Sequence, residues 1–226
     1  MKIEVLSLGG SLIVPDEVNY KFLNNFRDLI SKFRDRRFVI VVGGGSIARK
    51  YMRGLKNLGF GVRDISSAGA KVNDLNAWFM KRVFRGSAAQ KLPKNMGDIG
   101  GLLRKKKVIF LGVLKLEKGH TSDATAAEIA NHFKTRFINI TNVNGLYNKD
   151  PRKFRDAKLI KHASFKKFYK IANKMKYEPG QHFVLDQLGA KIIMKHRIRT
   201  FIVGPNLRNL ENLLRGKRFV GTTIYG

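Results

Sequence analysis

Short apolar runs alternate with amphipathic segments along most of the chain. The runs are rich in β-branched side chains, which is typical of strands that are buried on both faces of a parallel sheet. Five runs are predicted as strands: 2–8, 38–42, 108–111, 137–140 and 200–203. Two weaker stretches, 62–65 and 221–223, are also predicted as strands.

Between the strands, apolar residues recur at the spacing of a helix face. Helices are therefore predicted over 18–33, 46–58, 74–84, 121–132, 164–175, 183–195 and 207–214. The apolar side of the helix over 74–84 is predicted to carry Leu75, Trp78, Phe79 and Phe84. The segment 87–106 contains several glycines and is predicted to be irregular.

Strands that alternate with helices predict an α/β fold, a three-layer αβα sandwich with a mainly parallel sheet. Its 226 residues are enough for a substantial core. We find no internal repeat and no clear linker, and we expect a single domain over 1–226, with Asp150-Pro151 as the best lobe boundary.

The chain is strongly basic, with a formal net charge of +29. The excess is global: residues 1–113 hold 22 Lys and Arg against 8 acids, and residues 114–226 hold 23 against 8. Such a surface attracts polyanions, and it can bind nucleic acid nonspecifically whether or not that is its task. The absence of cysteine excludes disulfides and thiolate catalysis. No apolar run approaches 18 residues, so we expect a cytoplasmic protein without a membrane span.

Glycine-rich or polar loops follow four of the predicted strands. They are Gly9-Gly10-Ser11, Gly43-Gly44-Gly45, Gly119 to Asp123 and Thr141 to Asp150. The carboxyl ends of parallel strands converge on one crevice, so these loops can share a ligand. With Ser46 as a plausible helix N-cap, the triplet can offer backbone N–H groups to a phosphate, and Thr121 or Ser122 can cap a later helix. Two glycine loops suit two phosphate-bearing molecules and therefore phosphoryl transfer.

The triplet also fits a dinucleotide-binding fingerprint, Gly43-x-Gly45-x-x-Ala48, with Asp64 at a suitable distance. That fingerprint normally follows the first strand of its domain, whereas this one follows the second. A Rossmann dehydrogenase is therefore the weaker interpretation. Neither a Walker phosphate loop nor a Gly-x-Ser-x-Gly elbow is present, and the five scattered histidines make a structural zinc site improbable.

The sequence resembles the amino acid kinase superfamily, and within it the archaeal type of uridylate (UMP) kinase. The resemblance runs from Leu6-Ser-Leu-Gly-Gly-Ser11 to Gly221-Thr-Thr-Ile224. Its most specific segments are Val41-Val-Gly-Gly-Gly-x-x-Ala-Arg-Lys-Tyr51, Gly119-His-Thr-Ser-Asp-Ala124, Thr141-Asn-Val-Asn-Gly-Leu-Tyr-x-x-Asp-Pro151 and Asp186-x-Leu-x-Ala-Lys-Ile192.

The resemblance implies an ATP-dependent kinase that converts UMP to UDP, with Mg²⁺ arriving together with ATP. It implies an acceptor-binding lobe over about 1–135 and an ATP-binding lobe over about 136–226, in a homo-oligomer that is commonly a hexamer. Positions implied to hold the ATP phosphates are Gly10, Ser11, Gly45 and Arg49, and those around the adenosine are Thr141, Tyr147 and Asp150. Positions implied to hold UMP are Gly44, Ser66, Gly119, His120 and Thr121. Gly10 and Asp123 are implied to be catalytic, Asp123 as an organiser of nearby donors.

Each assignment has a simpler structural alternative. Asp123 can be a first-turn acid that the helix dipole favours, and Asp150-Pro151 can be a turn. Arg49 can be a solvated charge, and Tyr147 can be a core residue with its hydroxyl at the surface.

This chain departs from the family pattern mainly on the acceptor side. Ser7 replaces a common lysine, Ser66 replaces an aspartate near the UMP ribose, and Asn73-Asp74 replaces Thr-Arg. Asn144 replaces an aspartate, and the loop over 113–118 lacks the usual glycine and proline. Two alternatives to a UMP kinase follow: a kinase with another acceptor, or a divergent member without activity that binds RNA or another polyanion.

Overall fold

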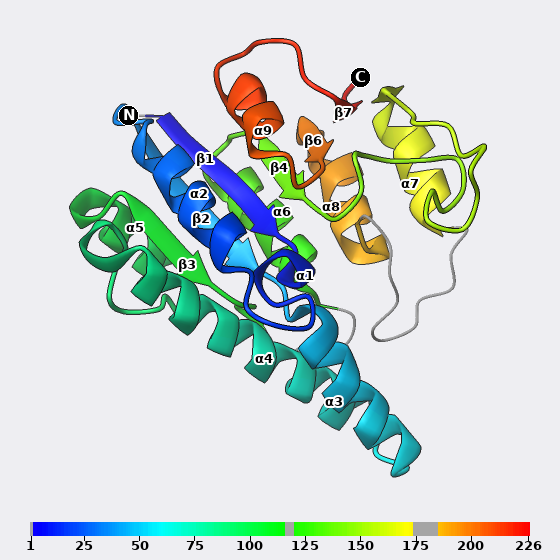
Figure 1. Ribbon diagram of the computed structural model, residues 1–226, viewed down its shortest axis with the longest axis horizontal. Helices are drawn as coiled ribbons and strands as arrows, with labels where there is room; N and C mark the ends of the chain where they lie inside the picture. Colours follow the sequence, from blue (N-terminus) through cyan, green and yellow to red (C-terminus); the bar gives the residue numbers. More distant parts are fainter. Residues whose placement is uncertain (1, 116–119, 174–184) are drawn as a thin grey trace.

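The computed structural model describes residues 2–115, 120–173 and 185–226, which form a three-layer αβα sandwich (Figure 1). Its seven-stranded sheet has the order β3-β2-β1-β4-β6-β7-β5. All neighbouring strands are parallel except β6 and β7, which are antiparallel. The predicted fold class is confirmed.

The strands reproduce the apolar runs of the sequence. Their bounds are β1 Lys2–Leu8, β2 Arg36–Val42, β3 Val108–Leu111, β4 Phe137–Ile140, β5 His162–Ala163, β6 Thr200–Val203 and β7 Gly221–Ile224. Only the short β5 was not expected. Residues of the central strands are buried on both faces, as their continuous apolar sequences predict.

Helices fill most of the remaining described chain. Their bounds are α1 Gly10–Ile13, α2 Tyr20–Ser31, α3 Gly45–Asn57, α4 Val62–Val83, α5 Met96–Lys105, α6 Ser122–His132, α7 Phe165–Asn173, α8 Gln187–His196 and α9 Leu207–Leu214, with a 3₁₀ turn at Arg85–Ser87. None of them has the length and apolar character needed to cross a membrane. The parts of the predicted helices 164–175 and 183–195 that fall within 174–184 lie outside the described residues.

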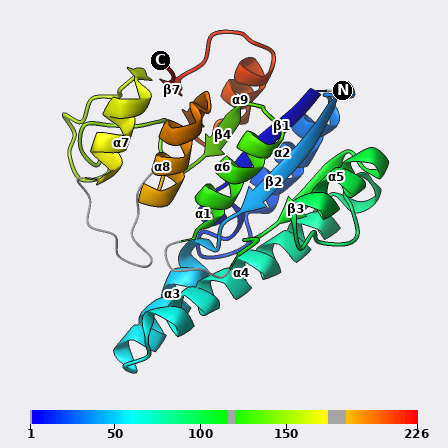
Figure 2. The same cartoon turned by 180° about the vertical axis from the view of Figure 1, so that it is seen from behind.

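Two hydrophobic cores lie on opposite faces of the sheet. Alternate residues of β2 supply both: Phe38, Ile40 and Val42 face one core, and Val39 and Val41 face the other. The first core is covered by α2, α4 and α9, and the second by α5, α6, α7 and α8. Figure 2 views the molecule from behind and shows this second set of helices.

The predicted strand over 62–65 is wrong, because these residues form the first turn of α4. Together, α3 and α4 form an antiparallel hairpin that projects past the carboxyl ends of the strands (Figure 1). The segment lies where no strand is available to pair with it. Gly61 takes an extended conformation at the N-cap, and Asp64 stands in the first turn, where the helix dipole favours an acid.

The interior side of α4 was also assigned wrongly in part. Leu75 and Trp78 are 58% and 46% exposed, whereas Ala77, Met80 and Phe84 are buried against the sheet. Phe79 is partly buried, as expected. The small and flexible side chains of Ala77 and Met80 pack where the sequence pattern favoured aromatic ones.

Two further predictions need correction. The segment 87–106 was expected to be irregular but contains α5, whose N-cap Asn95 accepts a hydrogen bond from the backbone N of Asp98 at 2.9 Å. Helix α3 begins at Gly45, with Gly44 as its N-cap rather than Ser46. The Ser46 hydroxyl instead donates to the carbonyl oxygen of Val14 at 3.0 Å, and so ties α3 to the loop after α1.

Candidate active site

The two predicted glycine loops touch each other at the carboxyl ends of β1 and β2. A Cβ placed on Gly10 would lie 2.3 Å from both the carbonyl oxygen of Gly43 and the amide nitrogen of Gly45, so only glycine fits there. Gly45 has φ +63°, a backbone conformation that favours glycine. The turn therefore requires glycine at Gly45 because φ is positive there. Gly10 is required because the backbones of the two loops approach each other closely at this point.

Helix α4 holds the triplet from the other side. The side-chain amide of Asn76 donates to the carbonyl oxygen of Gly43 at 2.8 Å, and both Asn76 and Asn73 are buried. A Cβ on Gly44 would lie 2.8 Å from the side-chain oxygen of Asn73. Sequence reasoning did not assign a role to Asn76. Its signal in the sequence is its helical spacing from Asn73 and Met80, which lie on the same buried side of α4.

The start of α6 brings Asp123 to the same end of the sheet, against the end of β1. Thr121 is the N-cap and accepts a hydrogen bond from the backbone N of Ala124 at 3.1 Å, which decides between Thr121 and Ser122. The hydroxyl of Ser7, from the end of β1, donates to Asp123 Oδ1 at 2.6 Å. Ser7 therefore binds this carboxylate directly, at the position where a lysine is common in the family.

A second carboxylate, Asp186, lies close to Asp123. Asp186 is the N-cap of α8 and accepts a hydrogen bond from the backbone N of Gly189 at 2.8 Å and another from the Thr121 hydroxyl. Thr121 thus connects α6 to α8. Sequence reasoning quoted the motif that contains Asp186 but gave this residue no role.

Burial raises the proton affinity of both carboxylates, and the charge of Asp186 adds to the effect on Asp123. Burial, followed by the negative charge of Asp186, raises the pKa of Asp123 to about 7, against the lowering effect of the Ser7 hydrogen bond. Burial also raises the pKa of Asp186, while hydrogen bonds from Thr121 and from backbone N–H groups oppose the shift. Both residues are partly exposed in the described structure. The pair can therefore hold or exchange a proton near neutral pH.

The expected adenosine positions follow the end of β4. The backbone N of Thr141 donates to the carbonyl oxygen of Val203 at 3.0 Å, and half-buried Tyr147 forms an isolated bridge with Leu159. Asp150 accepts two hydrogen bonds from the guanidinium of Arg152, from Nε at 2.9 Å and from Nη2 at 2.8 Å. These bonds hold the pKa of Asp150 at about 2.

Three expected acceptor positions are placed less directly. Gly119 lies outside the described residues. The His120 side chain is 2% exposed, with Nε2 3.4 Å from Glu128 Oε1 on α6, so any contact with a nucleotide falls to its backbone. Ser66 lies two turns before Asn73 on α4, about 10 Å along the helix axis.

The described part of the chain shows no metal-binding centre made of protein side chains. There, no group of three or more His, Asp or Glu side chains is arranged to hold an ion. What this part of the crevice offers is backbone N–H groups, the arginine Arg49 and a pair of carboxylates. Such a set suits the positioning of phosphates.

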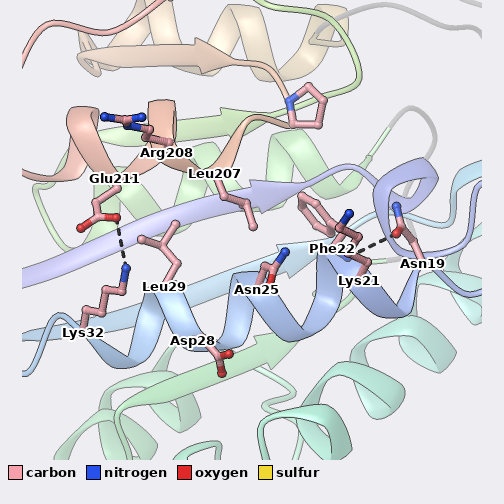
Figure 3. A pocket seen from close by; sticks show the side chains of 11 residues that line it. Asn19, Lys21, Phe22, Asn25, Asp28, Leu29, Lys32, Leu207, Arg208 and Glu211 are labelled. Carbon is pink, nitrogen blue, oxygen red and sulfur yellow. Dashed lines mark hydrogen bonds and ion pairs between the residues drawn. The ribbon is translucent and has the colours of Figure 1, made fainter.

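A separate groove of about 550 Å³ lies away from these residues, between α2 and α9 (Figure 3). Phe22, Leu29 and Leu207 form its apolar part, and an ion pair of 3.3 Å between Lys32 and Glu211 spans its two helices. It includes none of the predicted site residues.

Similarity to known proteins supports the fold described above. The sequence model of the amino acid kinase family matches residues 2–204. A uridylate kinase of Thermoplasma acidophilum is 31% identical over 97% of this chain and 95% of its own length. The crystal structure of uridylate kinase from Archaeoglobus fulgidus has a TM-score of 0.84 and 32% identity, and the match covers 99% of this chain and 100% of that one.

More distant structures share the fold alone. The UMP kinase of Bacillus anthracis has a TM-score of 0.80 at 16% identity over 99% of this chain and 96% of that one. A Rossmann dehydrogenase is excluded by this set of relatives, and none of them supports the RNA-binding alternative. From its loops, its sheet and its relatives, the chain belongs to the amino acid kinase family.

Proposed function

We propose that this protein transfers the terminal phosphoryl group of ATP to UMP and so forms UDP for pyrimidine nucleotide synthesis. The observation that supports it most is the pair of interlocked glycine loops, Gly10 against Gly43 and Gly45, at the strand ends. Two backbone segments in contact can hold two phosphate groups side by side, and phosphoryl transfer needs mainly such positioning. UMP is proposed as the acceptor because the chain is similar over nearly its whole length to uridylate kinases.

In this proposal, ATP and UMP bind on opposite sides of the glycine triplet. Gly10, Ser11, Gly45 and Arg49 bind the ATP phosphates, and Thr141, Tyr147 and Asp150 surround the adenosine. Gly44, Ser66, Gly119, His120 and Thr121 bind UMP, with the acceptor lobe over about 1–135 and the ATP lobe over about 136–226. Mg²⁺ comes with ATP and neutralises phosphate charge while bound.

Asp123 and Gly10 carry the catalytic work in this scheme. Gly10 brings its backbone against the transferring phosphate, because a side chain there would meet the triplet. Asp123 fixes the Ser7 hydroxyl and, near neutral pH, can hold a proton beside the reacting groups.

The direct test is an acceptor panel with purified protein and Mg-ATP. We expect kcat/KM for UMP to exceed the values for CMP, AMP and a small carboxylic acid by at least tenfold. If another compound of the panel has a higher kcat/KM than UMP, the protein is a kinase of this family with a different acceptor. Asp74 makes this comparison necessary, because it stands where the family has arginine, lies beside Gly112, and has its pKa raised by burial.

We also propose a homo-oligomer, a hexamer as the resemblance implies, that works in the cytoplasm where ATP and UMP are found. Large apolar side chains of the α3–α4 hairpin support it: Tyr51, Leu58, Phe60, Val62, Leu75 and Trp78 are all exposed in the single chain. Sedimentation at about 0.1 M and about 1 M salt tests it, since salt screens the repulsion between chains of charge +29. A monomer at both salt concentrations would contradict it.

A further inference from the structure

Asn76 is a buried amide on the side of α4 that faces the sheet. Ala77 and Met80 on the same side are apolar, and Asn76 itself is only 6% exposed. Burying an amide costs free energy unless it is hydrogen-bonded. The Nδ2 atom of Asn76 donates to the carbonyl oxygen of Gly43 at 2.8 Å. This hydrogen bond joins the middle of α4 to the turn between β2 and α3.

The hydrogen bond from Asn76 fixes one peptide group of the glycine triplet. In a trans peptide, the C=O and N–H bonds point in opposite directions. Because the carbonyl of Gly43 points to Asn76, the N–H of Gly44, which belongs to the same peptide, points away from Asn76. Among the described residues, this N–H has no hydrogen-bond acceptor. It is therefore available to a phosphate oxygen.

A glycine turn can lose this orientation easily. If the peptide between Gly43 and Gly44 rotated by half a turn, φ of Gly44 would change from −84° to a positive value, which glycine adopts about as readily. The Gly43 carbonyl would then point where the N–H points now, and a carbonyl oxygen repels an anion. A larger residue cannot prevent the rotation, because a Cβ on Gly44 would lie 2.3 Å from the Cβ of Ala48. The buried hydrogen bond from Asn76 favours one of the two orientations.

We propose that Asn76 is a positioning residue for the acceptor phosphate, because it holds the Gly43–Gly44 peptide with the N–H of Gly44 directed at that phosphate. This role rests on the proposed kinase function and adds to its acceptor site a residue that does not itself touch UMP. Asn76 acts from α4, whereas the N–H that it orients belongs to the turn before α3. The α3–α4 hairpin thereby sets the geometry of the phosphate site.

The test separates the phosphate of the acceptor from its nucleoside. Dissociation constants of UMP, uridine and ATP are measured by calorimetry, or by ligand-observed NMR where binding is weak, for wild type and Asn76→Leu. Leucine is branched at the same atom as asparagine but donates no hydrogen bond. We expect Asn76→Leu to weaken UMP binding roughly tenfold or more, and to change uridine and ATP binding less than about threefold. Asn76→Asp, which keeps the size but loses the N–H donor, should give the same pattern and serves if Asn76→Leu folds poorly.

Lys81→Met is the matched control. Lys81 is also buried on α4, and its side chain donates to a backbone carbonyl, that of Gln90, outside the glycine triplet. This variant should lose thermal stability as Asn76→Leu does, but it should keep the UMP affinity of the wild type. In protein labelled with ¹⁵N-glycine, UMP should shift the Gly44 amide signal in wild type and Lys81→Met, and not in Asn76→Leu.

Two results would overturn the role of Asn76. One is an equal loss of UMP affinity in Asn76→Leu and Lys81→Met, and the other is a loss of uridine affinity as large as that of UMP. If the wild type phosphorylates UMP in either case, the proposed function survives and only the role of Asn76 fails. A wild type that binds no UMP would remove both.

Discussion

Asp123 shows how a single residue can be costly to the fold and useful to the site. Its carboxylate is withdrawn from water beside Asp186, and its only stabilising hydrogen bond described comes from Ser7. A carboxyl whose pKa is raised in the folded state binds its proton more tightly there than in the unfolded chain. Its contribution to stability is therefore lost as pH rises from about 4 towards 7.

Asp123→Asn should remove this pH-dependent cost and also impair catalysis. We expect the melting temperature of the variant minus that of the wild type to increase between pH 5 and pH 7. The difference should then stay constant up to pH 8. We expect kcat to fall by on the order of a hundredfold. Thermal denaturation from pH 5 to 9 and steady-state kinetics measure the two effects.

Asp64→Asn is the control, because Asp64 is exposed in the first turn of α4 and outside the crevice. A stability difference between Asp123→Asn and wild type that does not change with pH would show that the folded state does not raise the pKa of Asp123 as described. Full activity of Asp123→Asn would remove Asp123 from the catalytic machinery.

At the scale of elements, the crevice depends on the contact between two loops. Gly10 begins α1 and meets the turn into α3, and Asn76 of α4 fastens that turn to the hairpin. Three elements from different parts of the chain therefore position the proposed phosphate site.

Gly10→Ala should break this contact. The new methyl group would meet backbone atoms of Gly43 and Gly45 at 2.3 Å, and backbone cannot move aside as a flexible side chain can. We expect a loss of stability of about 1 to 3 kcal/mol and a loss of most kinase activity. Chemical denaturation and the UMP assay measure both.

Gly54→Ala is the matched control within the neighbouring helix. No atom lies within 4 Å of a Cβ at Gly54, and alanine favours helix, so this variant should be more stable than wild type by about 0.5 to 1 kcal/mol. If both variants keep stability and activity, the loops are not in the close contact described.

Much of the element order was readable from the sequence, because buried parallel strands have continuous apolar runs. The strands β2, β3, β4 and β6 match their runs at 38–42, 108–111, 137–140 and 200–203 within two residues. The failures have local causes. At 62–65 the apolar residues lie in a projecting helix, and in α5 the glycines obscured the capping signal of Asn95.

The site was predictable only where a motif marked it. The glycine loops stand directly after β1 and β2, and Asp123 lies at the start of the helix that follows β3, so topology brings them together. The hydrogen bonds from Asn76 to Gly43 and from Thr121 to Asp186 join segments that are distant in sequence. No local pattern encodes such contacts, and they required the folded chain.

At the scale of the whole molecule, the crevice end and the opposite end of the sheet differ in kind. At the far end, the buried Glu4 binds Arg36 at 2.7 Å and Arg136 at 2.7 and 2.9 Å, which joins β1 to the starts of its neighbours β2 and β4. At this end, one buried carboxylate holds several cations in ion pairs. At the other end, the charge of Asp186 raises the pKa of Asp123, and Arg49 has no acidic partner among the described residues.

A crystal structure with UMP and a non-hydrolysable ATP analogue would test most directly whether the strand-end crevice is a phosphoryl-transfer site. We predict the ATP phosphates on Gly10, Gly45 and Arg49, and the UMP phosphate on the Gly44 side of the triplet, in line with the terminal ATP phosphate. Either nucleotide in the groove between α2 and α9 with the crevice empty, or both on one side of the triplet, would contradict it.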